Sequence, residues 1–231
     1  MTVYELQRRT LERLGDDPDL DPSLMHYTPS ETLAALNQVQ RLFVLYTLCL
    51  ETTANFGLTG VARYHMLATF GDWIVPLRIR NQIGNKVRPC RLADLAALDP
   101  NWSTQTGFPL RYAHTGFDLL SIYKTTTATV PITYARSPVE LLSSYPADNA
   151  QVPEIPERYH PALIDGAIPI LRTKEGAQEW QKTMPQWNRY MEAVQELAQK
   201  VRARCREQGY DAAPVEINRA DQSRFLNRKV G

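Results

Sequence analysis

The N-terminal part of the chain alternates apolar and polar positions with a helical repeat. Residues 3–14 carry apolar side chains close to that repeat and end at Gly15, which predicts one helix. Residues 31–48 predict a second helix with a broader apolar stripe, and Thr28 or Ser30 can cap its N-terminus. Because further apolar residues widen this stripe, we expect the second helix to be buried on most sides; these are Leu42, Leu45 and Tyr46.

A second helical region lies near the C-terminus. Pro156 suits the first turn of a helix, Glu157 complements the positive end of the helix dipole, and helical spacing continues to about Arg206. Pro185 predicts either a kink or a new helix start. The last part repeats apolar residues at alternating intervals of three and four, as in a coiled-coil seam, at Ala177, Trp180, Met184, Trp187, Met191, Val194, Ala198, Val201 and Cys205. This seam either joins subunits or packs on the other helices of the same chain.

From Glu51 the apolar repeat changes to two, which is typical of strands. Gly84-Asn85 separates two alternating runs and predicts a hairpin with a two-residue turn. Residues 91–98 predict a short helix, and residues 137–152 a linker rich in Ser, Pro and Asn. Further strands are expected at residues 108–114, 117–125 and 129–135.

This order of helices, strands and helices predicts an α+β fold. We expect a helical bundle frame with an inserted antiparallel β-rich domain and an extended C-terminal tail. The predicted boundaries are residues 1–50 and 153–210 for the bundle, 51–152 for the inserted domain and 211–231 for the C-terminal arm.

Charge is balanced overall but uneven along the chain. The 231 residues are 43% hydrophobic and 22% charged, with a net charge of +1, which disfavours a dedicated nucleic-acid-binding protein. Residues 218–231 hold four basic residues and one acid, so this tail is +3 and the rest is −2. The tail is either a disordered end or a segment that becomes ordered on a partner, with Phe225 and Leu226 as anchors.

Titratable residues form no recognisable catalytic or metal-binding pattern. The histidines at 26, 65, 114 and 160 are scattered, so structural roles are favoured over metal ligation or catalysis. The three cysteines, at 49, 90 and 205, are interpreted as reduced thiols. Asp17, Asp19 and Asp21 start with the spacing of a calcium loop, but Pro22 and Thr28 stand where glycine and an acid are needed, which favours a solvated loop. No cofactor or metal is expected.

Two further patterns bear on location and on ligand binding. The segment at the N-terminus lacks the basic and apolar regions of a signal peptide, and the longest apolar run, Leu42–Leu50, is too short to span a bilayer. We therefore expect a protein that does not associate with membranes. Trp102 follows a helix-ending turn, and the interpretation that it anchors this loop to the sheet is favoured over a ligand platform.

The order of these segments resembles the head-to-tail adaptor (neck or connector) proteins of tailed bacteriophages. The resemblance covers most of the chain, and the order of its parts carries it better than any single motif. Those parts are the first helix with its acidic loop, the helix at 31–48, the turn at 58–64, and the segments 73–80, 88–95, 98–102, 153–160 and 202–214.

The resemblance implies a structural role without catalysis. Such adaptors assemble as a ring, commonly of twelve copies, beneath the portal protein at one capsid vertex. The ring extends the DNA channel, lets genomic DNA pass without specific binding, and offers a docking surface to a tail or nozzle protein. We therefore expect a component of the virion neck that is made in the host cytoplasm and is a monomer before assembly.

The resemblance also implies contact residues. Because the C-terminal segment of such adaptors reaches the portal, portal-binding residues are expected at Arg219, Arg224, Phe225, Leu226, Arg228 and Lys229. The apolar seam supplies the expected subunit contacts, at Trp180, Trp187, Met191 and Val194. A ring needs two different faces that match each other on neighbouring subunits.

Three alternatives remain open at this point. A tail-completion or tail-terminator ring belongs to the same class and would bind the tail tube instead of the portal. A DNA-binding assembly factor would use the basic tail as its binding arm. An enzyme, such as a peptidoglycan hydrolase carried in the neck, would have Glu51 or Asp72 as its candidate acid, although no spacing singles them out.

Overall fold

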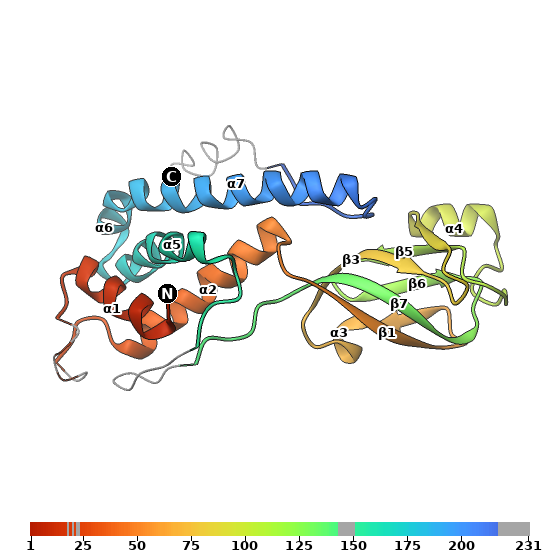
Figure 1. Cartoon of the computed structure of the whole chain (residues 1–231), viewed down its shortest axis with the longest axis horizontal. Coiled ribbons are helices and arrows are strands. Elements are labelled where there is room, and N and C mark those ends of the chain that lie inside the picture. Colours follow the sequence, from red (N-terminus) through yellow and green to blue (C-terminus); the bar gives the residue numbers. More distant parts are fainter. Residues whose placement is uncertain (18, 20, 22–23, 143–150, 217–231) are drawn as a thin grey trace.

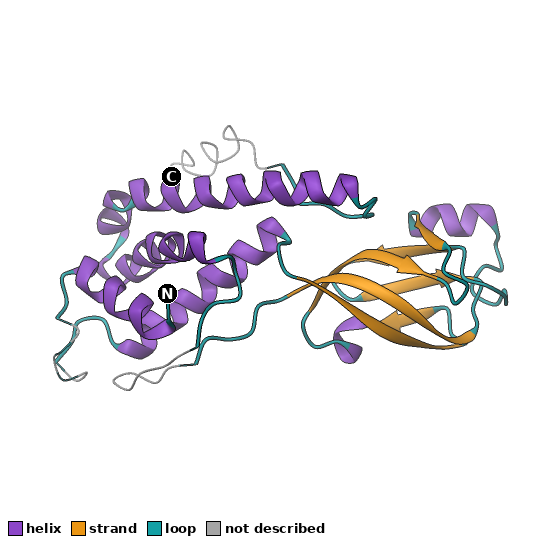
Figure 2. Cartoon of the chain, in the orientation of Figure 1, coloured by secondary structure: helices purple, strands orange, loops and turns teal. Residues whose placement is uncertain are grey.

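Helices and strands occupy separate parts of the structure, which lie next to each other along the longest axis (Figures 1 and 2). No strand is interleaved with the long helices, and α7 runs along the helical part until its end reaches the sheet. The computed structural model describes residues 1–17, 19, 21, 24–142 and 151–216.

The helical part is built from helices with clear sequence signals at their ends. Thr2 caps α1 and Thr28 caps α2 in the same way, since each side chain accepts the N–H three residues on, from Glu5 or Glu31, while that glutamate accepts the cap N–H. Gly15 ends α1 with a φ of 88°. The helices are α1 (Val3–Leu14), α2 (Pro29–Thr47), α5 (His160–Arg172), α6 (Ala177–Lys182) and α7 (Met184–Glu207), with short 3-10 turns at Glu157–Tyr159 and Thr173–Glu175.

α5 is the centre of the helical part, because it contacts α1, α2, α6 and α7. At Gly166 the helices approach so closely that a Cβ atom would lie 2.8 Å from Cδ2 of Tyr190 and 3.0 Å from Cγ1 of Val39. The Tyr190 hydroxyl donates to the Val39 carbonyl over 2.8 Å. The small residue on α5 therefore allows α2, α5 and α7 to share one core.

The predicted seam is divided between two helices. α6 ends at Lys182, and the hydroxyl of the buried Thr183 donates to the Trp180 carbonyl over 2.7 Å. α7 begins at Met184, so Pro185 lies in its first turn, where a missing N–H costs nothing. Of the two alternatives for Pro185, the structure therefore has the new helix start.

Seven strands form one curled sheet. Their order in the sheet is β1-β7-β3-β4-β5-β6-β2, so β1 and β2 form the two edges of the sheet. These two strands are nevertheless consecutive in the chain, and only residues 60–62 connect them. Such a short link requires the sheet to curl until its edges approach. The strands are β1 (Glu51–Thr59), β2 (Arg63–His65), β3 (Trp73–Arg80), β4 (Lys86–Pro89), β5 (Arg111–Thr115), β6 (Leu119–Tyr123) and β7 (Thr127–Arg136).

The curled sheet encloses a hydrophobic core of its own, which includes Trp73, Ile79, Val87, Tyr112 and Ile132. Two short helices belong to this part, α3 (Met66–Thr69) and α4 (Leu92–Leu98). The turn between β3 and β4 has five residues, 81–85, and not the predicted two.

Trp102 packs beside α4 in a small separate core. It is 6% exposed there, with Leu95 and Ala113 as neighbours, and the guanidinium of Arg63 lies 5.7 Å from the centre of its ring. The loop that follows α4 is therefore anchored to the sheet by this tryptophan.

The end of α7 is fastened to the sheet. The Asp211 N–H donates to the Leu77 carbonyl over 2.7 Å, and its carboxylate lies 2.6 Å from the Lys86 ammonium. The Tyr112 hydroxyl donates to the same carboxylate over 3.0 Å, and burial raises the pKa of this phenol. These contacts fix the two parts of the chain relative to each other.

The expected fold class is wrong. The chain is a mixed α+β protein with a seven-stranded curled sheet, and the helices do not form a bundle frame around an inserted β-rich domain. The sheet is also not purely antiparallel, because β4 and β5 pair in parallel across the connection that contains α4. Periodicity identified the segments, but it could not show that the strands close over a core of their own. Most of the expected C-terminal tail, from residue 217 on, lies outside the described residues.

Candidate assembly surfaces

The outer side of α2 carries several exposed or half-buried side chains, most of them apolar. Its inner side contributes to the shared helical core, with Phe43 fully buried. On the outer side Leu45 is 50% exposed and Tyr46 is 38% exposed, so the expectation that α2 is buried on most sides is wrong there. We call this surface the α2 face; it consists of Ala34, Gln38, Arg41, Leu42, Leu45 and Tyr46.

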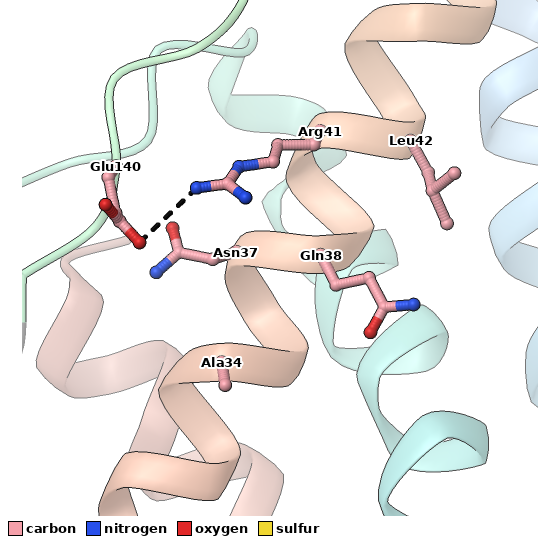
Figure 3. Close-up of a pocket in the computed structure, with 6 residues that line it drawn as sticks. All are labelled: Ala34, Asn37, Gln38, Arg41, Leu42 and Glu140. Atoms are coloured by element: carbon pink, nitrogen blue, oxygen red, sulfur yellow. Dashed lines mark hydrogen bonds and ion pairs between the residues drawn. The ribbon is translucent and has the colours of Figure 1, made fainter.

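The α2 face is hollowed at its centre (Figure 3). An open depression of about 440 Å³ is lined by five α2 residues and by Glu140, which comes from the segment after β7. Arg41 and Glu140 form an ion pair across one side, with 3.3 Å between Nη2 and Oε1. Both side chains are mostly exposed, so the pair adds little stability and can exchange for other contacts.

Buried amides hold the segment after β7 against α2. The Asn37 side chain donates to the Leu141 carbonyl over 3.0 Å and accepts the Leu141 N–H over 2.8 Å. Gln40 donates to the Val139 carbonyl over 3.0 Å. Glu140 lies between Val139 and Leu141, so the hydrogen bonds hold the Glu140 side of the depression against α2.

An arginine–glutamate pair fixes the same segment to the sheet. Arg136, at the end of β7, donates to both carboxylate oxygens of Glu154 over 2.9 and 2.6 Å. This hydrogen bonding lowers the pKa of Glu154, and the Val139 N–H, which donates to Glu154 over 2.8 Å, acts in the same direction.

The four residues predicted as subunit contacts differ in exposure. Met191 is 6% exposed and Val194 is fully buried, both in the core shared with α2 and α5. Trp180 on α6 and Trp187 on α7 are half-buried, and the Trp187 ring lies 5.1 Å from that of Tyr190. Contact with another subunit stays a prediction for all four. The predicted portal-binding residues, Arg219, Arg224, Phe225, Leu226, Arg228 and Lys229, lie outside the described residues.

The candidate titratable residues are distributed over separate local contacts. The buried His160 ring nitrogen Nε2 lies 3.0 Å from the Ile155 carbonyl, and His65 lies 2.9 Å from Asp118. Burial lowers the pKa of His114. Burial also raises the pKa of the cysteine thiols, at Cys49, Cys90 and Cys205.

The two candidate acids for an enzyme are also engaged locally. Asp72 accepts the Tyr134 hydroxyl over 3.0 Å, and Glu51 lies 3.3 Å from Arg204. Each of the two acids therefore has a separate partner within the chain.

Within residues 1–17, 19, 21, 24–142 and 151–216, no three histidine, cysteine or acidic residues gather in a way that could hold a metal ion. None of the helices in these ranges has the length and apolar character that crossing a bilayer requires.

Sequence reasoning missed the α2 face as a surface. Its signal was present, because Leu42, Leu45 and Tyr46 broaden the apolar stripe of residues 31–48 beyond what one core-facing side needs. An interpretation of this breadth as burial within one chain overlooks the outward-facing side of the helix. A stripe that is too wide for one neighbour also fits a helix with a second, external neighbour.

A comparison with protein families now gives the class. The chain is a structural protein of bacteriophages, an adaptor that belongs between head and tail, and hence a virion component. More specifically, it belongs to the SU10 adaptor protein family, whose model matches residues 1–217. This confirms the resemblance to head-to-tail adaptors. No curated protein matches the chain.

Proposed function

We propose that the protein forms a ring beneath the portal protein, extends the DNA channel there and provides the docking surface for the tail. The match to the SU10 adaptor protein family over residues 1–217 carries this proposal. The ring has about twelve copies, stands in the neck between the capsid vertex and the tail, and lets genomic DNA pass without specific binding. The protein is made in the host cytoplasm and reaches the virion by assembly.

Neighbouring subunits meet through the α2 face. A ring joins two different faces of one chain, so an exposed apolar face needs a matching face on the next copy. Leu45 and Tyr46 supply apolar area, and the depression with its exposed Arg41–Glu140 pair receives side chains of the neighbour. We assign the matching face to the exposed parts of Trp180 and Trp187. Met191 and Val194 lie in the shared core and hold α7 in place behind them.

The basic tail makes the portal contact. Residues 218–231 carry four basic residues and one acid, together with two apolar anchors, Phe225 and Leu226. This combination of charge and apolar anchors suits binding to the surface of another protein. Arg219, Arg224, Arg228 and Lys229 pair there with acidic groups of the portal.

Native mass spectrometry of mixtures with a purified portal ring tests this assignment. The full chain is compared with a version that ends at Ile217. We expect rings on the portal from the full chain and loss of assembly on truncation. Unchanged assembly of the shortened chain would overturn the portal role of the tail, and binding to tail tubes but not to portals would favour a tail-terminator ring.

The α2 face is tested with a matched pair of substitutions. Leu45 and Leu98 are equally exposed, at 50% each, but Leu98 lies on α4 in the sheet part. Placing a charge in an apolar contact costs several kcal/mol when a neighbour buries it. We therefore expect L45E to abolish ring formation on the portal and L98E to leave it intact. Equal behaviour of the two variants would contradict a subunit contact at α2.

A further inference from the structure

Five basic side chains from three neighbouring strands point to the same side of the sheet. In this region Ile79, Val87 and Tyr112 face the sheet core, so their neighbours along each strand face outward. Arg80 is paired with Lys86, and Arg88 with Arg111, across adjacent strands. We call this row the arginine strip; it consists of Arg78 and Arg80 on β3, Lys86 and Arg88 on β4, and Arg111 on β5.

The margins of the strip are engaged within the chain. The Arg78 guanidinium lies 5.3 Å from the centre of the Tyr210 ring, and Arg80 donates to the Gly84 carbonyl over 2.9 Å. Lys86 is paired with Asp211. At the centre, neither Arg88 nor Arg111 makes a side-chain hydrogen bond or an ion pair with any described residue.

This central pair is unfavourable for the isolated chain. Adjacent strands are only about 4.8 Å apart, and like charges that lie next to each other on them repel. The acid nearest in sequence, Asp94, accepts the Arg91 N–H at the start of α4 and forms no ion pair with either arginine. The whole segment 51–136 has nine basic and five acidic residues, a net charge of +4, whereas the full chain is +1. Folding does not need this excess, so it points to an external anionic group.

Exposed apolar side chains border the strip. Leu110 is 45% exposed, and its carbonyl accepts the Arg88 N–H over 3.0 Å, so its backbone lies next to that of Arg88. Phe108 is 51% exposed, and Ile83, in the β3–β4 turn, is 60% exposed. Arginine combined with apolar and aromatic side chains is typical of protein–protein contacts.

We propose that the arginine strip and its apolar border bind an acidic segment of another virion protein on the tail side, whose carboxylates pair with Arg88 and Arg111. Each guanidinium can bind a carboxylate by donating two parallel hydrogen bonds. This inference rests on the proposed adaptor role, which requires a docking surface distinct from the portal contact.

Two observations favour an acidic protein over DNA as the occupant. Phosphate backbones offer nothing to the exposed Phe108, Leu110 and Ile83, whereas a protein segment can bury them. A channel that lets DNA pass also works best without a concentrated row of phosphate-binding arginines, since each such contact strengthens binding. A surface that faces a protein is free of this conflict.

Fluorescence anisotropy with the full chain tests the occupant. The probes are a fluorescein-labelled oligoglutamate peptide with one central leucine, and a short DNA duplex with the same label, each titrated at low and physiological salt. The test variant is R88Q/R111Q, which removes both charges and keeps polar side chains that can hydrogen-bond. The control variant is R9Q/R206Q, which removes two exposed arginines from helices α1 and α7. Circular dichroism verifies that both variants fold.

We expect the peptide to bind the wild-type chain more tightly than the duplex does. R88Q/R111Q should weaken peptide binding at least about tenfold, and R9Q/R206Q less than about twofold. Equal losses in the two variants, or no peptide binding to the wild type, would overturn the proposal. Tighter binding of the duplex that is lost in R88Q/R111Q would make the strip a nucleic-acid contact. Ring formation of R88Q/R111Q on the portal, measured separately, reports on the proposed function independently of the strip.

Discussion

The helical part and the sheet part of this protein present different chemistry to their surroundings. Outside the basic tail, the residues flanking the sheet segment, 1–50 and 137–217, have thirteen basic and nineteen acidic residues, a net charge of −6, whereas residues 51–136 are at +4. The helical part offers the partly apolar α2 face, and the sheet part offers the arginine strip. An overall charge of +1 therefore hides two surfaces suited to different partners.

The two parts also differ in how they are held together. One hydrophobic core joins α1, α2, α5 and α7, and a second core fills the curled sheet. Between them lies the junction at Asp211, where the end of α7 meets Lys86, Tyr112 and Leu77. A small apolar cluster of Leu48, Leu77 and Ala135 lies at the same junction. Because each part also has a core of its own, each surface can change without rebuilding the other, which suits the proposed contacts with two partners.

The largest expected effects on stability come from replacing a large buried side chain in either core with alanine. Leu163 on α5 and Ile132 on β7 are both fully buried, so L163A and I132A should each lower the free energy of unfolding by about 2–5 kcal/mol. Chemical denaturation measures this with two reporter sets, Trp180 and Trp187 for the helices and Trp73 and Trp102 for the sheet, each isolated by replacing the other set with phenylalanine.

Because the junction couples the two parts, both reporter sets should follow one transition in either variant. L45A, at a position 50% exposed, is the control and should change stability by less than about 0.5 kcal/mol. Two separate transitions, with L163A shifting only the helical one, would show that the junction does not couple the cores.

A smaller effect is expected where the helices cross most closely. G166A places a methyl group 2.8 Å from Tyr190 and 3.0 Å from Val39, and overpacking of this kind costs about 1–3 kcal/mol. The matched control is G71A, since a Cβ there meets no atom within 4 Å and should be neutral or slightly stabilising. Thermal unfolding compares the two, and a G166A protein as stable as wild type would contradict close packing of α2, α5 and α7.

These two parts were also unequally predictable from the sequence. Helix ends follow from local signals, such as Thr28 with Glu31 for α2 and Gly15 for α1. Sheet register depends on distant segments, so the parallel pairing of Arg88 with Arg111 could not be inferred from two arginines 23 positions apart. For the same reason the charge pattern gave no sign of the arginine strip, which exists only once β3, β4 and β5 are side by side.

A third prediction concerns the link between the two parts after β7. Hydrogen bonding to Arg136 lowers the pKa of Glu154 below its ordinary value of 4.5. A carboxylate whose pKa is lower in the folded state stabilises the fold fully above that ordinary value, and this contribution disappears as the pH falls through the lowered pKa. E154Q should therefore cost about 1 kcal/mol at neutral pH and much less in strong acid.

Urea denaturation of wild type and E154Q at neutral and acidic pH measures this difference. E140Q serves as the control, because Glu140 and Arg41 are both mostly exposed and should contribute little at either pH. An E154Q deficit that is the same at both pH values would mean that the Glu154 charge does not hold the segment after β7 against the sheet.

The smallest effect has the opposite sign. R88Q/R111Q removes two adjacent like charges that no described acid neutralises, so the variant should be more stable than wild type by about 0.2–1 kcal/mol. The gain should shrink as salt is raised, because screening weakens the repulsion in the wild type. R9Q/R206Q should show no gain, since Arg9 and Arg206 lie on different helices, α1 and α7, and not on paired strands. Higher stability of R88Q/R111Q would support a role of these arginines in binding a partner. Lower stability would mean that they stabilise the fold itself.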